Sequence, residues 1–525
     1  MSATIRLLPA VVIGALALLS GCATHPGQTS SPFPVANAQL EQLRDNPVAL
    51  RMFIQQFPKG GDLHNHLSGA VYAEDFIDWA VEDGLCLDLD SLTASPPPCD
   101  SSRGQPPVAE HIAQDPFARD RLIDAWSMRN FVPGHSAASG HEQFFRTFFR
   151  FGKANSGRKG DMLAAARWHA ADQHVGYLEL MTSPAMGQAR ALARGLGSTD
   201  ELGVLHQALR DAGIDSLVQQ ASAQLQQMRT EADTLLGCKG AANMPSPDPA
   251  CDIEVRFLAQ VIRTFPSEEV FAQSLLAHLL VQHDPYVVGI NLVAPEDDHQ
   301  TLNDYHRQMN QLGWLAEQLG EVPVALHAGE LSLGLVHPRH LRHHIRSAVE
   351  IAGAQRIGHG VSIAHEYRPE ELLMAMAEHD IAVEINLTSN AQILGISGKH
   401  HPFQTYRQYG VPLTLSTDDA GVSRGDLSHE YQRATEAYQL TFADLLELSR
   451  NALEYAFIPG ESLWQAKVGG NYHPACADAT PPQSPPPTCT LFLADNPRAR
   501  LQWRHEGELH AFEQQRRELG NRRGW

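Results

Sequence analysis

Basic residues are scarce in this sequence. Its 525 residues include 40 lysines and arginines against 60 aspartates and glutamates, which gives a net charge of −20. A surface this acidic repels a phosphate backbone, so we expect no nucleic-acid partner. Hydrophobic residues make up 43% and charged residues 19% of the chain, as in ordinary globular proteins, and the length is ample for a large core.

A Cys-x-x-Cys motif is missing, which argues against a zinc knuckle. Besides Cys22, the cysteines fall into three pairs, each separated by 13 positions and enclosing a polar or proline-rich loop. The pairs are Cys86 with Cys99, Cys238 with Cys251, and Cys476 with Cys489. This repeated spacing predicts three local disulfides, each contributing about 3 kcal/mol, in an oxidising compartment. Reduced, unrelated cysteines are the alternative.

The apolar run near the N-terminus, at about residues 7–19, is too short to span a bilayer. It follows Arg6 and ends in the letters LSGC at Cys22. This ending resembles a bacterial lipoprotein signal, in which the cysteine is lipidated and becomes the new N-terminus. A plain secretory signal is the alternative. Because Ala23 follows the cysteine, the resemblance implies an exported lipoprotein of the Gram-negative outer membrane and periplasm, held to the membrane by its lipid alone.

Short apolar runs alternate with helical patterns along most of the chain. The candidate strands are residues 62–67, 175–182, 252–262, 286–293, 322–329, 356–360, 381–387 and 411–417. Eight strands separated by helices predict an α/β fold, a (β/α)8 TIM barrel. We expect a signal and lipidation segment at 1–22, a flexible tether at 23–37, a helical segment at 38–57, a barrel with disulfide-closed insertions at 58–460, and a C-terminal extension at 461–525.

Polar side chains crowd the carboxyl ends of four of these runs. They are His64 and His66, His327 and Glu330, His359, and Asp418 with Asp419. A barrel gathers its strand ends around one pocket, and positions i and i+2 of a strand face the same way. The three imidazoles of His64, His66 and His327, with the carboxylate of Asp418, therefore suit one zinc ion. Zinc keeps a water in a catalytic site and lowers the pKa of that water toward 7.

The remaining polar residues at these strand ends predict catalytic roles. Glu330, three residues after His327, can act as a general acid or base, and His359 can orient the zinc hydroxide. Asp419 follows Asp418 but points elsewhere, and it can accept a hydrogen bond from the substrate. A His-x-His motif alone is more often structural, so the metal interpretation depends on the ligands from other strands.

The motifs PKGGDLHNHLSGA, HAGE, RIGHG and STDDAGV occur in the order seen in the adenosine deaminase family, which the chain resembles from about residue 58 to 459. PKGG, NLVAPED and the cysteine pairs are similar to the secreted growth-factor-like branch. The resemblance implies hydrolytic deamination of adenosine, and of 2′-deoxyadenosine, to inosine and ammonia. It implies that His64, His66, His327 and Asp418 bind one zinc ion, that Glu330 protonates purine nitrogen 1, that His359 positions the hydroxide for attack at carbon 6, and that Asp419 holds nitrogen 7.

Three positions depart from the family pattern. Ser68 stands where members often carry an acidic residue that contacts the sugar, Ala294 replaces a glycine whose backbone contacts purine nitrogen 3, and Asn291 replaces an aspartate. A deaminase of adenine or of a modified adenosine is therefore the first alternative. A catalytically weak nucleoside-binding or signalling protein is the second, although Glu330 argues against it. A dinuclear amidohydrolase is disfavoured because residues 286–293 contain no lysine.

Other polar residues have simpler interpretations. The run HPRHLRHH at 337–344 predicts a solvated helix face, and His400 and His401 predict polar residues of a loop that could line the pocket. Glu179, at a strand end, is either a pocket carboxylate or a salt-bridged one. The growth-factor-like branch often dimerises through an N-terminal extension, which is short here at 38–57, so a homodimer stays an open possibility.

Overall fold

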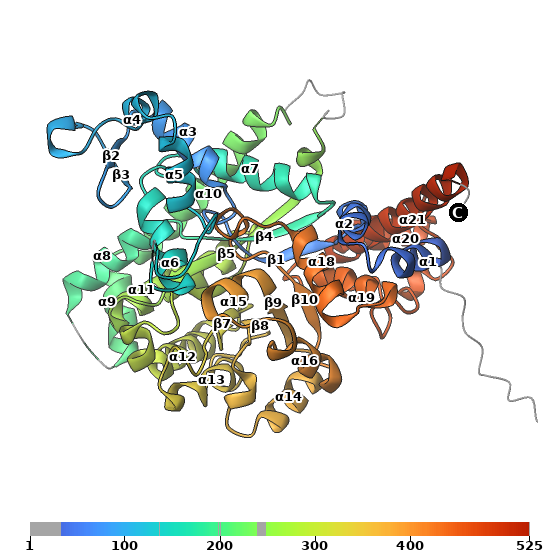
Figure 1. Cartoon of the computed structure of the whole chain (residues 1–525). Coiled ribbons are helices and arrows are strands. Elements are labelled where there is room, and N and C mark those ends of the chain that lie inside the picture. Colours follow the sequence, from blue (N-terminus) through green and yellow to red (C-terminus); the bar gives the residue numbers. More distant parts are fainter. Residues whose placement is uncertain (1–32, 136, 198, 200, 239–247, 524–525) are drawn as a thin grey trace, which may run out of the picture.

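Parallel strands form the centre of the fold. The computed structural model describes residues 33–523, apart from 136, 198, 200 and 239–247 (Figure 1). Within these residues, one four-stranded parallel sheet has the order β1-β4-β5-β6, and a second has the order β10-β9-β8-β7. The strands are β1 (Gly61–His66), β4 (Tyr177–Thr182), β5 (Glu254–Ile262), β6 (Val287–Val293), β7 (Ala325–Ala328), β8 (Arg356–His359), β9 (Ala382–Ile385) and β10 (Leu413–Leu415).

Each of the eight expected strands is present, within a few residues of its predicted bounds. Every residue of β4 and of β6 is buried, as expected for parallel strands covered on both faces. The sequence prediction worked because such strands appear as short, nearly continuous apolar runs.

The two sheets approach each other at both outer edges. Ile290 of β6 forms a single parallel bridge with Val324, just before β7, and Asn65 of β1 forms another with Asp418, just after β10. Among the described residues, no continuous ladder joins one sheet to the other. The α/β class and the parallel sheets are therefore confirmed, whereas closure into a single barrel stays a prediction.

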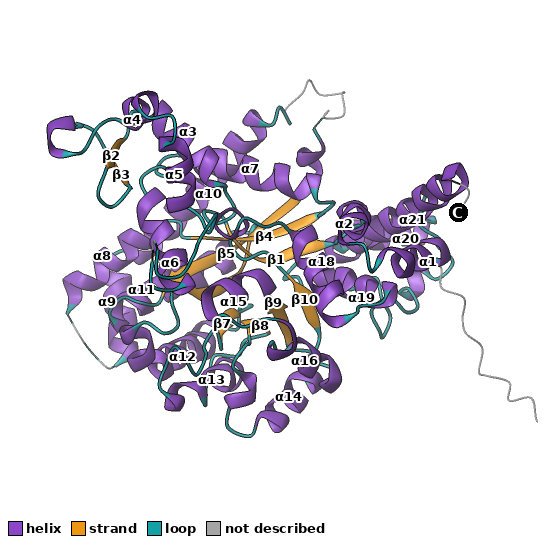
Figure 2. Cartoon of the chain, viewed as in Figure 1, coloured by secondary structure: helices purple, strands orange, loops and turns teal. Residues whose placement is uncertain are grey.

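Helices surround the strands (Figure 2). Those between the strands include α3 (Ala73–Glu82), α4 (Val108–Gln114), α5 (Ala118–Ala125), α6 (Gly140–Phe151), α7 (Lys159–Asp172), α8 (Met186–Leu196), α9 (Leu202–Asp211), α10 (Ile214–Leu235), α11 (Ser267–His283), α12 (His299–Leu319), α13 (His344–Glu350), α14 (Pro369–Glu378), α15 (Leu387–Leu394) and α16 (Phe403–Tyr409). After β10 come α17 (Ala420–Ser423), α18 (Leu427–Tyr438), α19 (Phe442–Glu454), α20 (Pro487–Asp495) and α21 (Pro497–Arg523). None of the helices in the described residues is both long and apolar enough to cross a bilayer.

A buried lysine lies at the connection between the second helix and the first strand. Lys59 lies between α2 (Pro47–Gln56) and β1, and its Nζ donates to the carbonyls of Ile54, Phe57 and Gln173 at 2.8, 2.8 and 2.7 Å. The first two carbonyls lie at the C-terminus of α2, where a helix leaves such groups unpaired. Burial lowers the pKa of this amine well below its usual range. Lys59 thus ends α2 and directs the chain into the first strand.

The C-terminal helix packs against the N-terminal one. The carboxylate of Glu513 in α21 accepts hydrogen bonds from the backbone amides of Val35 and Ala36, at 3.0 and 2.9 Å. These amides open α1 (Pro34–Leu43), so the two ends of the described chain lie together, as Figure 1 shows. The helix α1 begins inside the segment predicted as a tether.

All three predicted disulfides are present: Cys86–Cys99, Cys238–Cys251 and Cys476–Cys489. The first closes a loop that holds the two-stranded antiparallel sheet of β2 (Cys86–Asp88) and β3 (Thr93–Ser95). The predicted lipidation site, Cys22, and the signal and tether before residue 33 lie outside the described residues.

Candidate metal and catalytic site

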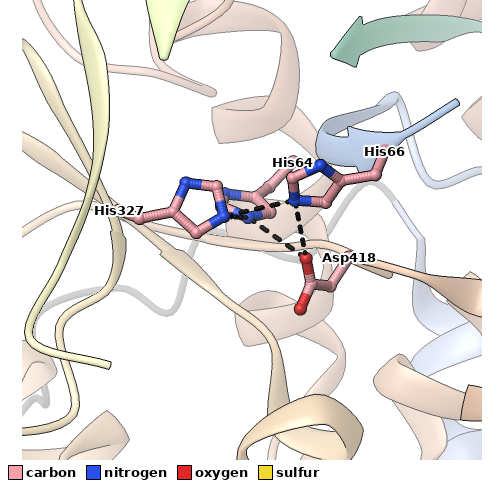
Figure 3. A group of neighbouring side chains, drawn as sticks. All are labelled: His64, His66, His327 and Asp418. Carbon is pink, nitrogen blue, oxygen red and sulfur yellow. Dashed lines mark hydrogen bonds and ion pairs between the residues drawn. The ribbon is translucent and has the colours of Figure 1, made fainter. Parts of the chain in front are cut away.

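Four ligand atoms from three places in the chain converge at the carboxyl ends of the strands. Nε2 of His327, in β7, lies 3.1 Å from Nε2 of His64 and 3.2 Å from Nε2 of His66, which both belong to β1. Oδ1 of Asp418, which follows β10, lies 3.3 Å from each of the β1 nitrogens (Figure 3). These four side chains form a group that can hold a metal ion.

Backbone hydrogen bonds place Asp418 against β1. Its amide donates to the carbonyl of His64 at 2.8 Å, and its carbonyl accepts from the amide of His66 at 2.9 Å. The φ angle of Asp418 is 60°, in the left-handed region that non-glycine residues seldom adopt. The bridge at this seam therefore holds an unusual backbone conformation that carries the carboxylate into the site.

The second ring nitrogen of each histidine faces an oxygen. Nδ1 of His64 lies 2.6 Å from Oε2 of Glu384, Nδ1 of His66 lies 3.0 Å from Oε1 of Gln260, and Nδ1 of His327 lies 2.7 Å from Oδ1 of Asn291. Each Nδ1 thus donates its proton to an oxygen and leaves the lone pair of Nε2 for a metal. Oxygen partners of this kind are typical of metal-binding histidines.

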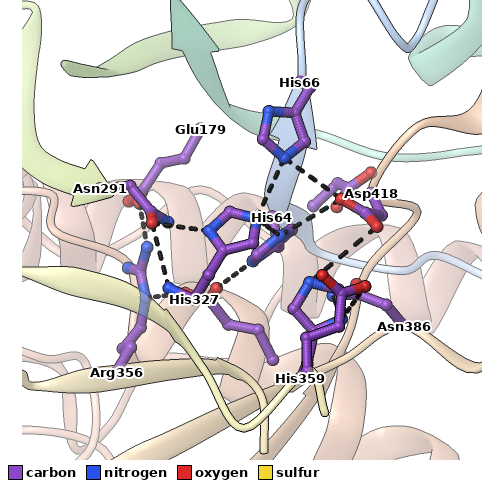
Figure 4. A network of polar contacts seen from close by, with 12 residues as sticks. His64, His66, Glu179, Asn291, His327, Arg356, His359, Asn386 and Asp418 are labelled. Atoms are coloured by element: carbon purple, nitrogen blue, oxygen red, sulfur yellow. Dashed lines mark hydrogen bonds and ion pairs between the residues drawn. The ribbon is translucent and has the colours of Figure 1, made fainter. Parts of the chain in front are cut away.

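A buried ionic network supports His64 (Figure 4). The guanidinium of Arg356 donates from Nε to Glu384 at 2.6 Å and from Nη2 to Glu179 at 2.5 Å. All three side chains are almost fully buried. Of the two interpretations of Glu179, the salt-bridged carboxylate is confirmed.

The donor set fits a divalent metal. Three neutral imidazole nitrogens and one carboxylate oxygen are a common ligand set for such ions, and zinc in particular accepts nitrogen and oxygen ligands. Within the described residues, Oδ1 of Asp418 is a buried atom that no hydrogen-bond donor satisfies. An unsatisfied buried carboxylate oxygen is costly, and a bound cation removes that cost.

Glu330 lies next to this group with a carboxyl that favours its protonated form. Burial, and then the negative charge of Asp418, raises the pKa of Glu330 well above its usual range. Its Oε1 lies 3.5 Å from Nδ1 of His359, at the end of β8. Nε2 of His359 lies 4.0 Å from Oδ2 of Asp418. A neutral carboxylic acid can donate a proton here, as a general acid must.

Asp419 faces the turn that follows β1. A Cβ atom added at Gly69 would lie 1.5 Å from Oδ1 of Asp419, so only glycine leaves room for this carboxyl. Burial raises the pKa of Asp419 to about 8, which makes it a hydrogen-bond donor at neutral pH. Ser68, the neighbour of Gly69, is half-buried in the same turn.

The backbone at Ala294, just after β6, has a conformation that is strained for a residue other than glycine. Its φ angle is 79°, in the left-handed region that favours glycine. Nε of Arg263 donates to the carbonyl of Ala294 at 3.0 Å, and Nη1 donates to the carbonyl of His327 at 2.9 Å. Arg263 therefore holds the ends of β6 and β7 together, a role that the sequence did not suggest.

One prediction about the histidine run at 337–344 is wrong. His344 is fully buried rather than solvated, and its Nδ1 donates to Oε1 of Glu296 at 2.5 Å. The same carboxylate accepts from the amides of Gly329 and Glu330, at 3.0 and 2.7 Å. The sequence prediction failed because this carboxylate comes from the loop after β6, far from the run.

A comparison with protein families identifies the family to which the chain belongs. The family model described as "Adenosine deaminase" matches residues 162–465, more than half of the chain. The chain belongs to the adenosine deaminase family. His327, Glu330, His359 and Asp418 fall inside the matched span, whereas the two histidines of β1 precede it.

Curated relatives of this adenosine deaminase family member match over a shorter span. The adenosine deaminase of Pectobacterium atrosepticum is 31% identical over 219 residues, which is 41% of this chain and 58% of that protein. The adenosine deaminase of Shewanella loihica is 28% identical over 223 residues, which is 41% of this chain and 61% of that protein. The chain thus matches about three fifths of the length of these relatives.

Solved structures are similar over more of the chain at lower identity. Adenine deaminase from Arthrobacter aurescens has a TM-score of 0.48 and 16% identity, and covers 77% of this chain and 94% of its own. The N6-mAMP deaminase of arabidopsis has a TM-score of 0.47 and 22% identity, and covers 78% of this chain and 96% of its own.

Proposed function

We propose that the chain is a zinc-dependent hydrolase that deaminates adenosine and 2′-deoxyadenosine to inosine and ammonia. The observation that carries the proposal is the convergence of the three Nε2 atoms and Asp418 Oδ1 beside Glu330, whose carboxyl favours the protonated form. A metal site next to a neutral carboxylic acid suits attack by water on an aromatic carbon whose ring nitrogen must be protonated.

Each part of the reaction can be assigned to residues of the site. Zinc, held by His64, His66, His327 and Asp418, would supply a water activated at neutral pH. Glu330 would donate its proton to purine nitrogen 1 and so make carbon 6 electrophilic. His359 would orient the attacking water, and ammonia would leave carbon 6 as the oxygen stays. Because purine nitrogen 7 can only accept a hydrogen bond, Asp419 would hold it as a protonated donor, rather than as the acceptor that its sequence position first suggests.

A direct assay tests this proposal. The purified chain, with its zinc content measured by elemental analysis, is incubated with adenosine, and ammonia release and the loss of purine absorbance are followed. We expect turnover that falls on chelation of the metal and returns with zinc. Tight binding of adenosine without ammonia release from any aminopurine would instead favour a nucleoside-binding or signalling role.

Another 6-aminopurine is the second candidate substrate. Ser68 removes the usual acidic contact to the sugar, and Ala294 places a methyl group where the family pattern has a glycine. Rates with adenosine, 2′-deoxyadenosine, adenine and N6-methyladenosine separate the candidates. A preference for adenine would show that the sugar contributes little to binding.

We also propose that the two parallel sheets are halves of one (β/α)8 barrel. The bridges Ile290–Val324 and Asn65–Asp418 support closure at both seams. In this view residues 58–460 form the barrel, and residues 461–525 form an extension packed against it. A closed barrel requires backbone hydrogen bonds between β6 and β7 and between β10 and β1. An experimental structure without them would contradict the closed form.

Export as a lipoprotein is a further part of the proposal. The three disulfides support it, because such bonds persist in oxidising compartments. Metabolic labelling with a radioactive fatty acid tests it. We expect the label on the wild-type chain and none on Cys22→Ala, and equal labelling of both would refute lipidation at this cysteine.

A further inference from the structure

A buried chain of hydrogen bonds reaches His359 from outside the metal site. It passes through His401, which precedes α16, and Asn390, which lies in α15. His359 and Asn390 are fully buried, and His401 is only 4% exposed. His401 is a polar residue of the loop before α16, as predicted, and its side chain lies inside the protein, where it contacts Asn390.

A backbone amide fixes the direction of this chain. The amide of Phe403 can only donate, and it donates to Nδ1 of His401 at 3.2 Å. Nδ1 of His401 therefore carries a lone pair, and the single proton of the neutral ring lies on Nε2. Nε2 of His401 lies 3.1 Å from Oδ1 of Asn390 and so donates to it.

The same direction continues to His359. Because Oδ1 of Asn390 accepts from His401, the amide nitrogen Nδ2 is the atom that faces His359, and it donates to Nδ1 at 2.8 Å. Nδ2 of Asn386 lies 3.4 Å from the same ring nitrogen. Nδ1 of His359 is thus an acceptor, and its proton lies on Nε2, which has no hydrogen-bond partner within the described residues.

His401 favours the neutral form that this pattern requires, because burial lowers its pKa to about 4. A neutral ring has one proton, so a proton on Nδ1 of His359 would meet the N–H of Asn390 head-on.

We propose that His401 and Asn390 are positioning residues that hold His359 as an Nε2–H donor directed at the metal site. His359 then donates a hydrogen bond to the attacking water and leaves the proton transfer to purine to Glu330. This consequence for catalysis rests on the proposed deaminase function. The position of the proton on the His359 ring does not rest on that function, because it follows from the hydrogen bonds alone.

Nitrogen NMR tests the ring directly. The chain labelled with 15N-histidine is examined by correlating the ring nitrogens with the ring protons, and the signal lost in His359→Asn identifies His359. We expect a protonated Nε2 and an unprotonated Nδ1. A protonated Nδ1 in the wild-type ring would overturn the proposal, whether or not any aminopurine is deaminated.

Variants at Asn390 and His401 test the catalytic consequence. Asn390→Asp replaces the donor to His359 with an oxygen that can only accept when ionised, so the proton of His359 moves to Nδ1. We expect kcat to fall about 10–100-fold, the range typical of residues that orient active-site ligands, while KM and zinc content change less than about twofold. His401→Leu removes the donor to Asn390 and should lower kcat as well, whereas the conservative His401→Gln retains an amide donor and should rescue most of kcat. A kcat of Asn390→Asp equal to that of the wild type would refute the role of Asn390. A wild-type protein without turnover would refute the deaminase function but not the position of the proton on His359.

Discussion

Oδ1 of Asn291 accepts two hydrogen bonds from His327, one from Nδ1 at 2.7 Å and one from the backbone amide at 3.2 Å. The backbone amide can only donate, so it fixes the oxygen of Asn291 toward His327. Asn291 therefore orients His327, one of the four candidate metal ligands. The sequence showed only that Asn291 replaces an aspartate of the family pattern and did not reveal this role.

The first prediction concerns this contact. Asn291→Leu removes the acceptor of Nδ1–H, and we expect zinc affinity to fall about 10–100-fold, because outer partners of this kind orient the ligand. Asn291→Asp restores the family's usual residue and keeps an oxygen acceptor, so it should retain zinc. Competition with a chelator measures both affinities. Equal affinity in Asn291→Leu and the wild type would contradict the role of the contact.

The second prediction concerns the proton donor. Glu330→Gln keeps the size of the side chain and lies outside the four metal ligands, so we expect normal zinc content. The amide cannot donate a proton as the acid does, and kcat should fall about 10²–10⁴-fold. Steady-state kinetics and elemental analysis on the same sample provide the test, and near-normal kcat would remove Glu330 from the mechanism.

The third prediction uses the close approach of Gly69 to Asp419. Gly69→Ala forces the Asp419 carboxyl to move, because the added Cβ would lie 1.5 Å from Oδ1. A shift of about 1 Å in a binding group can cost about 10²-fold in kcat/KM. Gly195→Ala, in the exposed part of α8 where nothing lies within 4 Å of the added atom, is the matched control. It should be neutral or slightly stabilising, and an equal loss of activity in both variants would contradict the prediction.

The fourth prediction concerns pH and stability. Burial raises the pKa of Glu430 from 4.5 to about 7, so the folded chain holds a proton that the unfolded chain releases between these values. This contribution to stability is fully present below pH 4.5 and is lost as the pH rises toward 7, by about 1.4 kcal/mol per pH unit. Glu430→Gln has no such proton. Denaturant unfolding from pH 4.5 to 8 should therefore show the wild type losing stability relative to Glu430→Gln. The control Glu436→Gln changes an exposed carboxyl, so its stability relative to the wild type should not change with pH.

The sequence predicted the strands and the ligand quartet for physical reasons that are local. Apolar runs mark buried parallel strands, and alternation places His64 and His66 on one face. The oxygens behind the ligands were not predictable in this way, since Glu384 and Gln260 meet His64 and His66 only across the folded sheets. The error at His344 has the same cause, because its partner Glu296 follows a different strand.

The seam between β1 and Asp418 has a consequence for the order of assembly. The quartet unites the first strand of the fold with the residue that follows the last one, so no nascent chain shorter than 418 residues holds a complete ligand set. A chain that ends between residues 327 and 418 contains the three histidines without the carboxylate and would bind metal less tightly. Tight uptake of the ion would therefore report that the two ends of the strand array have met.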